Sequence, residues 1–389
     1  MAWAVPMRKF GLVPMVRTAD GIPVRTRLGA RGDVKAHTSA SPRASNCRPA
    51  WTQSPASATL PAAWADIELS APWPERELTI ADPGARKVMT LVRLHNQPLG
   101  VVVLDVSQDR TWHAHSAIVM AALRSRINDH LAADGLPGTD DIESIASEHD
   151  SVPQCISQRI ALMIDPPQMT VIVATHERPD ALRACLDSVL RQDYPRFKVV
   201  VVDNDPHTIE TTKLIATQFY PRVQYVRELR RGTAPAHNRG LHAAQGTIAA
   251  FVDDTVVVDR SWLTGVAEGF AGATDVGCVT GPTLPAELNT HAQLMLERRG
   301  AADEGFEQRT FDTDLNRRGE PLFAFAAGRF GAATNLAFDT ALLRRLGGVE
   351  HASGNGTFTR GGRDLSAFFR IILQHRLVYQ PAAIVWSST

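Results

Sequence analysis

The sequence lacks long apolar runs, closely spaced cysteines and an excess of either charge. No uninterrupted apolar segment approaches the roughly 20 residues of a membrane-spanning helix, so no transmembrane segment is predicted. The 41 Lys and Arg residues balance 41 Asp and Glu residues, and no overall field favours nucleic acid as a partner. No C-x-x-C spacing occurs, which indicates neither a disulfide framework nor a zinc site among Cys47, Cys155, Cys185 and Cys278.

Two nucleotide-binding signatures are also missing. A dinucleotide-binding fold would place G-x-G-x-x-G after its first strand, but the segment "ATHERPD" contains no glycine. No G-x-x-x-x-G-K-[ST] occurs, which excludes a P-loop nucleoside triphosphatase. Any nucleotide site must therefore be built in another way.

The N-terminal third predicts three segments of different character. Residues 1–65 are rich in Arg, Ser, Pro and Ala and predict a disordered basic arm, because little apolar surface is available to bury. Residues 66–136 predict a small α+β module: two β-rich runs surround the turn signal "HNQPLG", and a helical pattern ends at Gly135. One H-x-H pair, His113 and His115, is weak evidence for a metal. Residues 137–166 are polar and interrupted by prolines, which predicts a linker.

From residue 167 the pattern becomes that of an α/β protein. The segments "MTVIVAT", "FKVVVVDN", "VQYVRE" and "TIAAFVDD" are short β-rich runs, and helical patterns separate them. Strands that are apolar on both faces and alternate with helices are typical of a largely parallel sheet covered on both sides. We therefore expect an α/β domain over residues 167–389.

Polar residues follow several of these strands at the point where each one ends. Ligands of open α/β sheets bind beyond the carboxyl ends of the strands. Carboxylates there could hold a divalent cation on a diphosphate, and arginines could clamp phosphate oxygens. A helix N-cap or a solvated loop end explains any one acid equally well, whereas their joint position favours a ligand site. The candidates are Thr175, Glu177, Arg178, Asp203, Arg230, Arg231, Asp253 and Asp254.

Four blocks carry a resemblance to a known family. They are "TVIVATHERPDALRACLDSVLRQDYPRFKVVVVDN", "AHNRGLHAAQGTIAAFVDDTVVVDRSWL", "AAGRFGAATNLAFDTALLRRLGGVE" and "GGRDLSAFFRIILQHRLVYQPAAIVW". Together they resemble the inverting family-2 glycosyltransferases of the GT-A fold, over about residues 167–386. The preceding unit resembles an N-terminal module of some actinobacterial members. The resemblance implies a GT-A-like nucleotide-diphospho-sugar transferase fold with a mostly parallel sheet, beside a small α+β module.

The resemblance also implies roles for individual residues. Thr175, Glu177 and Arg178 would line the nucleotide pocket, and Asp203 would recognise the base. Arg230 or Arg231 would lie near the diphosphate. Asp253 and Asp254 would form the DXD-like acidic motif, with Asp254 as the ligand of a divalent cation, Mg or Mn. Asp364 in "GGRDL" would be the general base.

The sequence departs from the family pattern at three places. Thr255 stands where a third acid, commonly the direct metal ligand, is usual, and a neutral hydroxyl binds a hard cation far more weakly. Arg363 replaces a Glu beside Asp364, and a neighbouring cation lowers the pKa of a carboxylate and weakens it as a base. The chain ends at "WSST", where the family continues into a His-rich stretch, so we expect a C-terminally short domain.

Two functions are consistent with these observations. The first is an inverting glycosyltransferase that transfers a sugar from a nucleotide-sugar, UDP- or dTDP-linked, to a saccharide, a lipid-linked glycan or a small metabolite. The second is a catalytically degenerate GT-A-fold protein that binds a nucleotide-sugar or a partner without turnover. A cytoplasmic location is expected, with peripheral membrane association left open.

Overall fold

The computed structural model describes residues 63–71, 87–106, 112–146, 151–286, 305–316, 330–331, 334–349 and 363–387. All of these residues lie in one compact unit, residues 48–389. Within these ranges, every helix is too short or too polar to cross a lipid bilayer.

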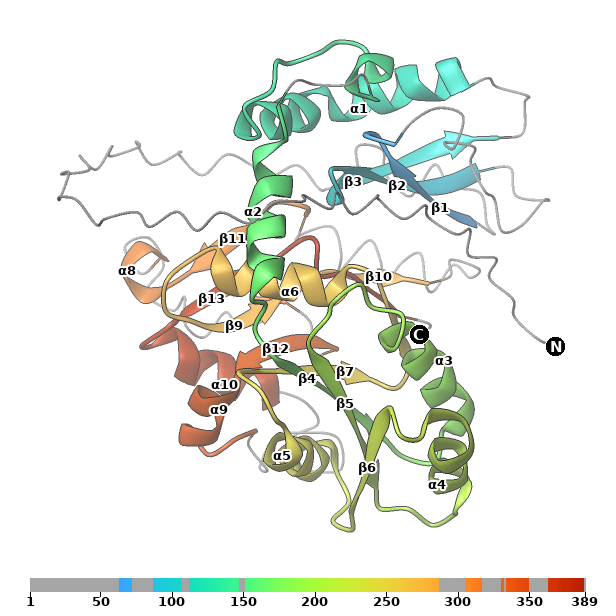
Figure 1. The fold of residues 1–389 in the computed structure, drawn as a ribbon, viewed down its shortest axis with the longest axis vertical. Coiled ribbons are helices and arrows are strands. Elements are labelled where there is room, and N and C mark those ends of the chain that lie inside the picture. Colours follow the sequence, from blue (N-terminus) through green and yellow to red (C-terminus); the bar gives the residue numbers. More distant parts are fainter. Residues whose placement is uncertain are drawn as a thin grey trace, which may run out of the picture. The chain divides into compact units, whose positions relative to one another are not determined.

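An eight-stranded sheet forms the centre of the α/β segment, in the order β11-β13-β9-β12-β7-β4-β5-β6 (Figure 1). Strands β7, β4, β5 and β6 run parallel to one another. β12 is antiparallel to both of its neighbours, and β11 is antiparallel to β13. The strand bounds are β4 Met169–Thr175, β5 Phe197–Asn204, β6 Val223–Glu228, β7 Ile248–Asp253, β9 Val276–Thr280, β11 Arg309–Phe311, β12 Asn335–Asp339 and β13 Arg376–Tyr379.

Apolar side chains on both faces of these strands bury the sheet between helices. Val171 and Val173 of β4 pack on one face with α3 (Pro179–Val189) and α6 (Trp262–Ala271). Ile172 of β4 packs on the other face with α5 (Thr233–Ala243). A Cβ on Gly240 of α5 would lie 2.3 Å from the Ile172 side chain, so only glycine permits this close helix–strand contact.

Shorter elements complete the α/β segment. A second sheet has the order β10-β14-β8. Its strands are β8 Val256–Val258, β10 Thr283–Pro285 and β14 Val385–Ser387. The remaining helices are α4 Glu210–Leu214 with its continuation η3 Ile215–Phe219, α8 Thr313–Asn316, α9 Thr340–Arg345 and α10 Arg363–Ile372.

The N-terminal module is a three-stranded sheet covered by one long helix. β1 (Ala63–Glu68) is parallel to β2 (Lys87–Leu94), and β2 is antiparallel to β3 (Gln97–Asp105). Helix α1 (Trp112–Ala133) packs on one face of this sheet. The other face packs against Leu284 and Ile384 of the α/β segment. Both faces are thus buried, so the module shares a core with the α/β segment.

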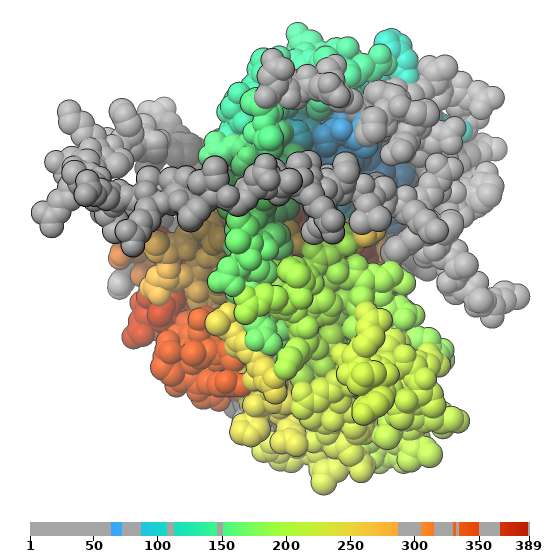
Figure 2. All heavy atoms as spheres, in the orientation of Figure 1, coloured from blue at the N-terminus to red at the C-terminus, as the bar shows by residue number. Residues whose placement is uncertain are grey.

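Helical structure also occurs between the module and the central sheet. A 3-10 helix, η2 (Ile142–Ala146), precedes α2 (Gln154–Ile164). Figure 2 shows α2 at the molecular surface, and Ile164 at its end is 81% exposed. Leu162 and Met163, by contrast, pack against the core of the α/β segment. This packing stabilises a helix within residues 137–166, where we expected a linker.

Strand β1 begins at Ala63, inside the segment expected to be a disordered arm. The strand forms because it pairs with β2, which starts 24 residues later in the chain, at Lys87. Residues 1–62 of the expected arm lie outside the described residues. The proposed division into arm, module, linker and transferase domain stays a prediction.

Candidate functional site

The register of the central sheet brings three of the expected strand ends to one edge. Thr175, the last residue of β4, is the direct partner of Asp203 on β5. Ala174 is paired with Asp253 on β7. Because all three strands are parallel, their carboxyl ends meet where open α/β sheets bind ligands.

Asp254 is the centre of a small polar cluster at this edge. The Thr175 hydroxyl donates a hydrogen bond to Asp254 Oδ2 at 2.7 Å, and Arg178 Nη1 donates to Asp254 Oδ1 at 3.1 Å. We call these three residues the Asp254 cluster. Asp254 is buried, and its burial raises the pKa of the carboxyl group although both donors favour the charged form. A cation beside this carboxylate would offset the cost of that burial.

Asp203 lies beside the Asp254 cluster and is fully buried. The Tyr225 hydroxyl donates to Asp203 Oδ2 at 2.7 Å. Asp203 Oδ1 has no hydrogen-bond partner among the described residues. Burial raises the pKa of this carboxyl group. Buried acceptors are nearly always paired, so this oxygen is available to a donor from a bound molecule.

Glu177 uses its carboxylate to hold a neighbouring loop. Oε1 accepts from the backbone N–H groups of His207 and Thr208, and Oε2 accepts from the Thr208 hydroxyl at 2.7 Å. The Thr208 side chain and these backbone donors lower the pKa of Glu177. The structure therefore joins the loops after β4 and β5 through Glu177, and the expected contact with nucleotide stays a prediction.

The two arginines after β6 are exposed and lie on a loop that Asn204 holds in place. Asn204 Nδ2 donates to the carbonyl of Arg230 at 2.8 Å, and its Oδ1 accepts from the N–H of Gly232 at 3.0 Å. Arg230 forms a two-pronged ion pair with Glu228, while 68% of its side chain stays exposed. Arg231 is also exposed. Both guanidinium groups can turn toward a phosphate without breaking the buried core.

The remaining predicted site residues differ in their placement. In β7 the buried Val252 packs on the α3 face of the sheet, so strand alternation places Asp253 on the opposite face from Thr175. Asp364 lies in α10, but its side chain and that of Arg363 are outside the described part. The structure thus joins Thr175, Arg178 and Asp254 directly, with Asp203 as their neighbour.

The Asp254 cluster fits a divalent cation in a limited way. Magnesium sites in transferases use one or two protein carboxylates, and substrate phosphates and water complete the octahedron. Asp254 offers one such carboxylate, and the exposed Arg178 can leave its Oδ1. Among the described residues, no group of three or more His, Cys, Asp or Glu ligands forms at this edge. The residues present therefore fit a cation held mainly by the diphosphate.

Three residues that hold this edge together were not singled out as site residues from the sequence. They are Asn204, which fixes the loop after β6, Tyr225, which donates to Asp203, and Glu228, which binds Arg230. Asn204 follows Asp203 in the quoted "VVVVDN", and its position at a strand end was the available signal. Tyr225 and Glu228 lie in or at the end of β6, where sequence periodicity only indicates a strand.

Part of the chain is similar to known proteins. Residues 170–334 match the family described as glycosyl transferase family 2. The chain is 33% identical over 144 residues to the O-antigen biosynthesis protein RfbC of Myxococcus xanthus. The aligned stretch covers 36% of this chain and 11% of that protein. The chain is also 31% identical over 103 residues to the glycosyltransferase AglE of Haloferax volcanii. That aligned stretch covers 25% of this chain and 33% of that protein. The chain thus spans a third or less of these relatives.

A comparison with solved structures returns a mannosyltransferase from Pyrobaculum calidifontis in complex with GDP-Man and Mn2+. The TM-score is 0.42 with 21% sequence identity, covering 70% of this chain and 68% of that chain. The family match and the mostly parallel sheet confirm the expected fold class, an α/β GT-A-like fold beside a small strand module. These sequence similarities are confined to part of the chain.

Proposed function

We propose that the α/β segment transfers a glycosyl group from a nucleotide-diphospho-sugar to an acceptor hydroxyl with inversion at the anomeric carbon. The observation that supports this most is the buried Oδ1 of Asp203, which has no hydrogen-bond partner in the described part of the chain and lies next to the Asp254 cluster. Uracil and thymine carry an N–H group that such an acceptor can bind, and a UDP- or dTDP-sugar is the donor in this proposal. The base would then direct the diphosphate along the strand edge toward Asp254.

In this proposal Asp254 holds a divalent cation, Mg or Mn, which neutralises charge on the leaving diphosphate when it is bound. The Thr175 hydroxyl orients the Asp254 carboxylate, and Arg178 lies beside it to bind a phosphate oxygen. Asp364, by its resemblance to the family's base, takes the proton of the acceptor hydroxyl as that oxygen attacks. The proposed acceptors are a saccharide, a lipid-linked glycan or a small metabolite. A cytoplasmic location is proposed, with peripheral membrane association left open.

A second candidate function is nucleotide-sugar binding without turnover. Thr255 in place of the usual third acid favours it, because one carboxylate fewer weakens cation binding. Arg363 beside Asp364 favours it as well, because a nearby cation makes the base weaker. The two candidates share the binding site and differ only in the chemical step.

The binding site is tested by calorimetry with UDP, dTDP and GDP, with and without Mg or Mn. We expect UDP or dTDP to bind the unchanged chain and Asp203→Asn to weaken this binding by at least about tenfold, because an amide either presents a weaker acceptor or turns its N–H2 toward the base. Asp187→Asn, an exposed acid on α3, is the matched control and should bind as the unchanged chain does. Absence of nucleotide binding would overturn both candidates.

The chemical step is tested by donor hydrolysis and transfer with a panel of nucleotide-sugars. We expect weak, metal-dependent turnover of a UDP- or dTDP-sugar. The double variant Thr255→Asp with Arg363→Glu should turn over faster, because it restores a cation ligand and removes the positive neighbour of the base. A restored protein that binds nucleotide but remains inactive would reject the transferase and leave the binding function.

A further inference from the structure

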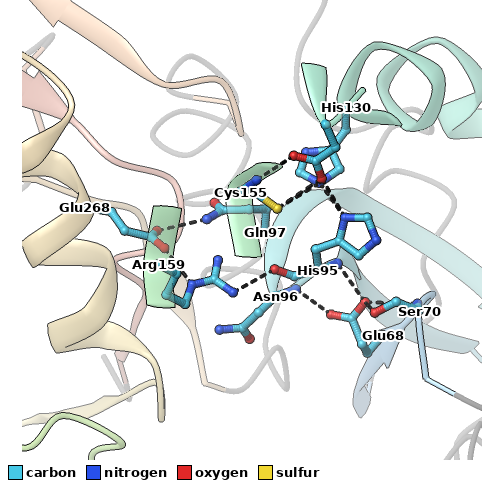
Figure 3. A network of polar contacts seen from close by, with 10 residues as sticks. Glu68, Ser70, His95, Asn96, Gln97, His130, Cys155, Arg159 and Glu268 are labelled. Carbon is cyan, nitrogen blue, oxygen red and sulfur yellow. Dashed lines mark hydrogen bonds and ion pairs between the residues drawn. The ribbon is translucent and has the colours of Figure 1, made fainter. Parts of the chain in front are cut away.

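Four metal-binding side chains converge away from the strand edge, where the β2–β3 turn, the end of α1 and the start of α2 meet (Figure 3). Their candidate ligand atoms all lie within 4.8 Å of one another. Nothing in the proposed transferase reaction uses these residues. We call them the His–Cys cluster; its members are His95, His130, Asp134 and Cys155.

The distances within the His–Cys cluster match those of a four-coordinate metal site. His95 Nδ1 lies 3.2 Å from His130 Nε2, and Cys155 Sγ lies 3.9 Å from His130 Nε2. Metal–nitrogen bonds of about 2.0 Å and metal–sulfur bonds of about 2.3 Å in a tetrahedron imply ligand separations of roughly 3.3–3.6 Å. Small side-chain shifts would therefore place a cation between these atoms.

Asp134 connects the members of the cluster through one of its two oxygens. Oδ2 lies 2.7 Å from His95 Nδ1, 3.1 Å from His130 Nε2 and 3.0 Å from Cys155 Sγ. A single oxygen thus faces two imidazoles and a thiol. Oδ1 accepts a hydrogen bond from the backbone N–H of Cys155 at 2.8 Å, which fixes the orientation of the carboxylate. Such outer contacts are typical of metal-binding carboxylates.

The His–Cys cluster is more buried than a hydrogen-bond network at the protein surface. The side chains of His95 and Asp134 are 4% and 3% exposed, and that of His130 is 15% exposed. Cys155 is half-buried. Removing a carboxylate and two imidazoles from water is costly unless hydrogen bonds or a cation compensate them. The partial exposure of His130 and Cys155 leaves a side from which an ion can enter.

Local backbone structure places each member of the cluster. His95 and Asn96 form a two-residue hairpin turn with φ values of 53° and 66°, a conformation that favours Asn and Gly over His. His130 and Asp134 are four residues apart at the end of α1, and Gly135 follows with φ of 75°. Cys155 lies in the first turn of α2. Burial and the contact with Asp134 raise the pKa of its thiol, so the thiolate depends on a bound cation.

A second layer of contacts ties the His–Cys cluster to the α/β segment. The His95 carbonyl accepts a hydrogen bond from Arg159 Nη1 of α2 at 3.0 Å, and Arg159 Nε forms an ion pair with Glu268 of α6 at 2.6 Å (Figure 3). Gln97 Nε2 also donates to Glu268 at 2.9 Å. The cluster therefore lies at the junction of the module, α2 and the α/β segment.

We propose that the His–Cys cluster is a structural zinc site in which the two imidazoles, the carboxylate and the thiolate are the four ligands. Two nitrogens, one sulfur and one oxygen are the donors that zinc accepts in tetrahedral sites, whereas magnesium and calcium prefer oxygen alone. The charges of thiolate and carboxylate cancel that of Zn2+, which suits a buried site. Four protein ligands leave no open position, so the ion holds the module and α2 together and takes no part in the transfer.

Metal content of the untagged full-length chain tests this proposal. We expect about one zinc per chain after dialysis into metal-free buffer, measured by mass spectrometry for all first-row metals. Cys155→Ser should lose affinity by more than the roughly 10–100-fold that an outer-shell change costs. The matched control is His113→Gln on the same helix, since 87% of the His113 side chain is exposed outside the cluster. It should retain the zinc of the unchanged chain.

Cobalt substitution keeps the test valid if a variant folds poorly. The unchanged chain, stripped of zinc and loaded with Co2+, should show the intense visible bands of a tetrahedral site and a thiolate charge-transfer band. His95→Gln retains the thiolate and should weaken the visible bands while keeping part of the charge-transfer band. Exchange of backbone amides should also rise in α2 after zinc removal, because the ion joins α2 to α1.

Three outcomes would overturn the zinc site. The first is less than about a tenth of an equivalent of zinc together with no zinc uptake by the stripped chain. The second is equal zinc content in the unchanged chain and in Cys155→Ser. The third is a stoichiometric metal other than zinc that zinc does not displace. None of these readouts depends on nucleotide binding, so the zinc proposal and the transferase proposal can be rejected independently of each other.

Discussion

The strand edge and the junction around α2 both contain buried carboxylates, but the oxygens of these carboxylates are used differently. At the junction, both oxygens of Asp134 face donors: the Cys155 backbone N–H on one side, and His95 and the Cys155 thiol on the other. At the strand edge, Asp203 has one oxygen engaged by Tyr225 and one without a partner among the described residues. The first pattern holds elements together, and the second is suited to a ligand.

The carboxyl groups at the strand edge also affect the stability of the folded chain. Burial raises the pKa of both Asp203 and Asp254, which means that the folded chain disfavours their charged forms. A protein retains such groups at a cost in stability where binding or catalysis needs them. Residues at the junction should therefore affect stability first, and residues at the strand edge should affect ligand binding first.

The largest expected effect concerns stability at the junction. Arg93 of β2 binds Asp66 of β1 at 2.9 Å and Asp259 of the α/β segment at 2.5 Å, and its side chain is 5% exposed. Arg93→Ala should lower the free energy of unfolding by about 3–5 kcal/mol, because it leaves Asp259, whose side chain is 12% exposed, without this partner. Urea unfolding measures this effect. Arg124→Ala, which breaks an exposed pair with Asp140, should change stability by about 0–1 kcal/mol.

Equal losses of unfolding free energy in Arg93→Ala and Arg124→Ala would contradict a buried link between the module and the α/β segment. A second unfolding transition in Arg93→Ala alone would sharpen the comparison. It would show that the link makes the two parts unfold together.

The second effect separates ligand binding from stability. Asp254→Asn should weaken metal-dependent nucleotide binding on the order of 100-fold, about 2.7 kcal/mol, because a neutral amide cannot compensate the cation. Its zinc content should equal that of the unchanged chain. Calorimetry and metal analysis of the same sample make the measurement. A variant that keeps its nucleotide affinity but loses stability would place Asp254 with the structural carboxylates instead.

The smallest effect is a pH-dependent one at Asp203. Tyr225→Phe removes the hydroxyl that donates to this buried carboxylate and should cost about 1–3 kcal/mol at neutral pH. The pKa of Asp203 is already raised in the folded chain, so the favourable contribution of its protonated form is present at low pH and disappears as pH rises through the folded pKa. Loss of the tyrosine donor raises that pKa further.

The stability difference between Tyr225→Phe and the unchanged chain should therefore grow from acidic pH, near the ordinary aspartate value of 3.8, toward neutrality. Urea unfolding at several pH values measures it. Thr212→Val, which removes the hydroxyl that donates to Tyr225 on its exposed side, is the control and should show a smaller change with pH. A constant difference across the pH range would mean that Asp203 does not become charged there.

Much of the α/β segment could be predicted because its signals are local. Apolar runs such as "MTVIVAT" form β4 in the structure, and Asp203 and Asp253 lie in the last two positions of their strands. Thr175, Asp203 and Asp254 meet at one edge because parallel strands place their carboxyl ends together. The loop-holding role of Glu177 could not be predicted, since it depends on where the loop at His207 returns.

The sequence by itself determined the class of fold and the location of the strand edge, because periodic burial and strand order act over short stretches of chain. Only the tertiary structure decided which carboxylate oxygens find a donor among the described residues, since that depends on distant residues such as Tyr225. The tertiary structure also brings together the His–Cys cluster, whose members come from a turn, a helix end and a helix start. The spacing of these residues in the sequence does not predict the cluster, because packing of the module on the α/β segment creates it.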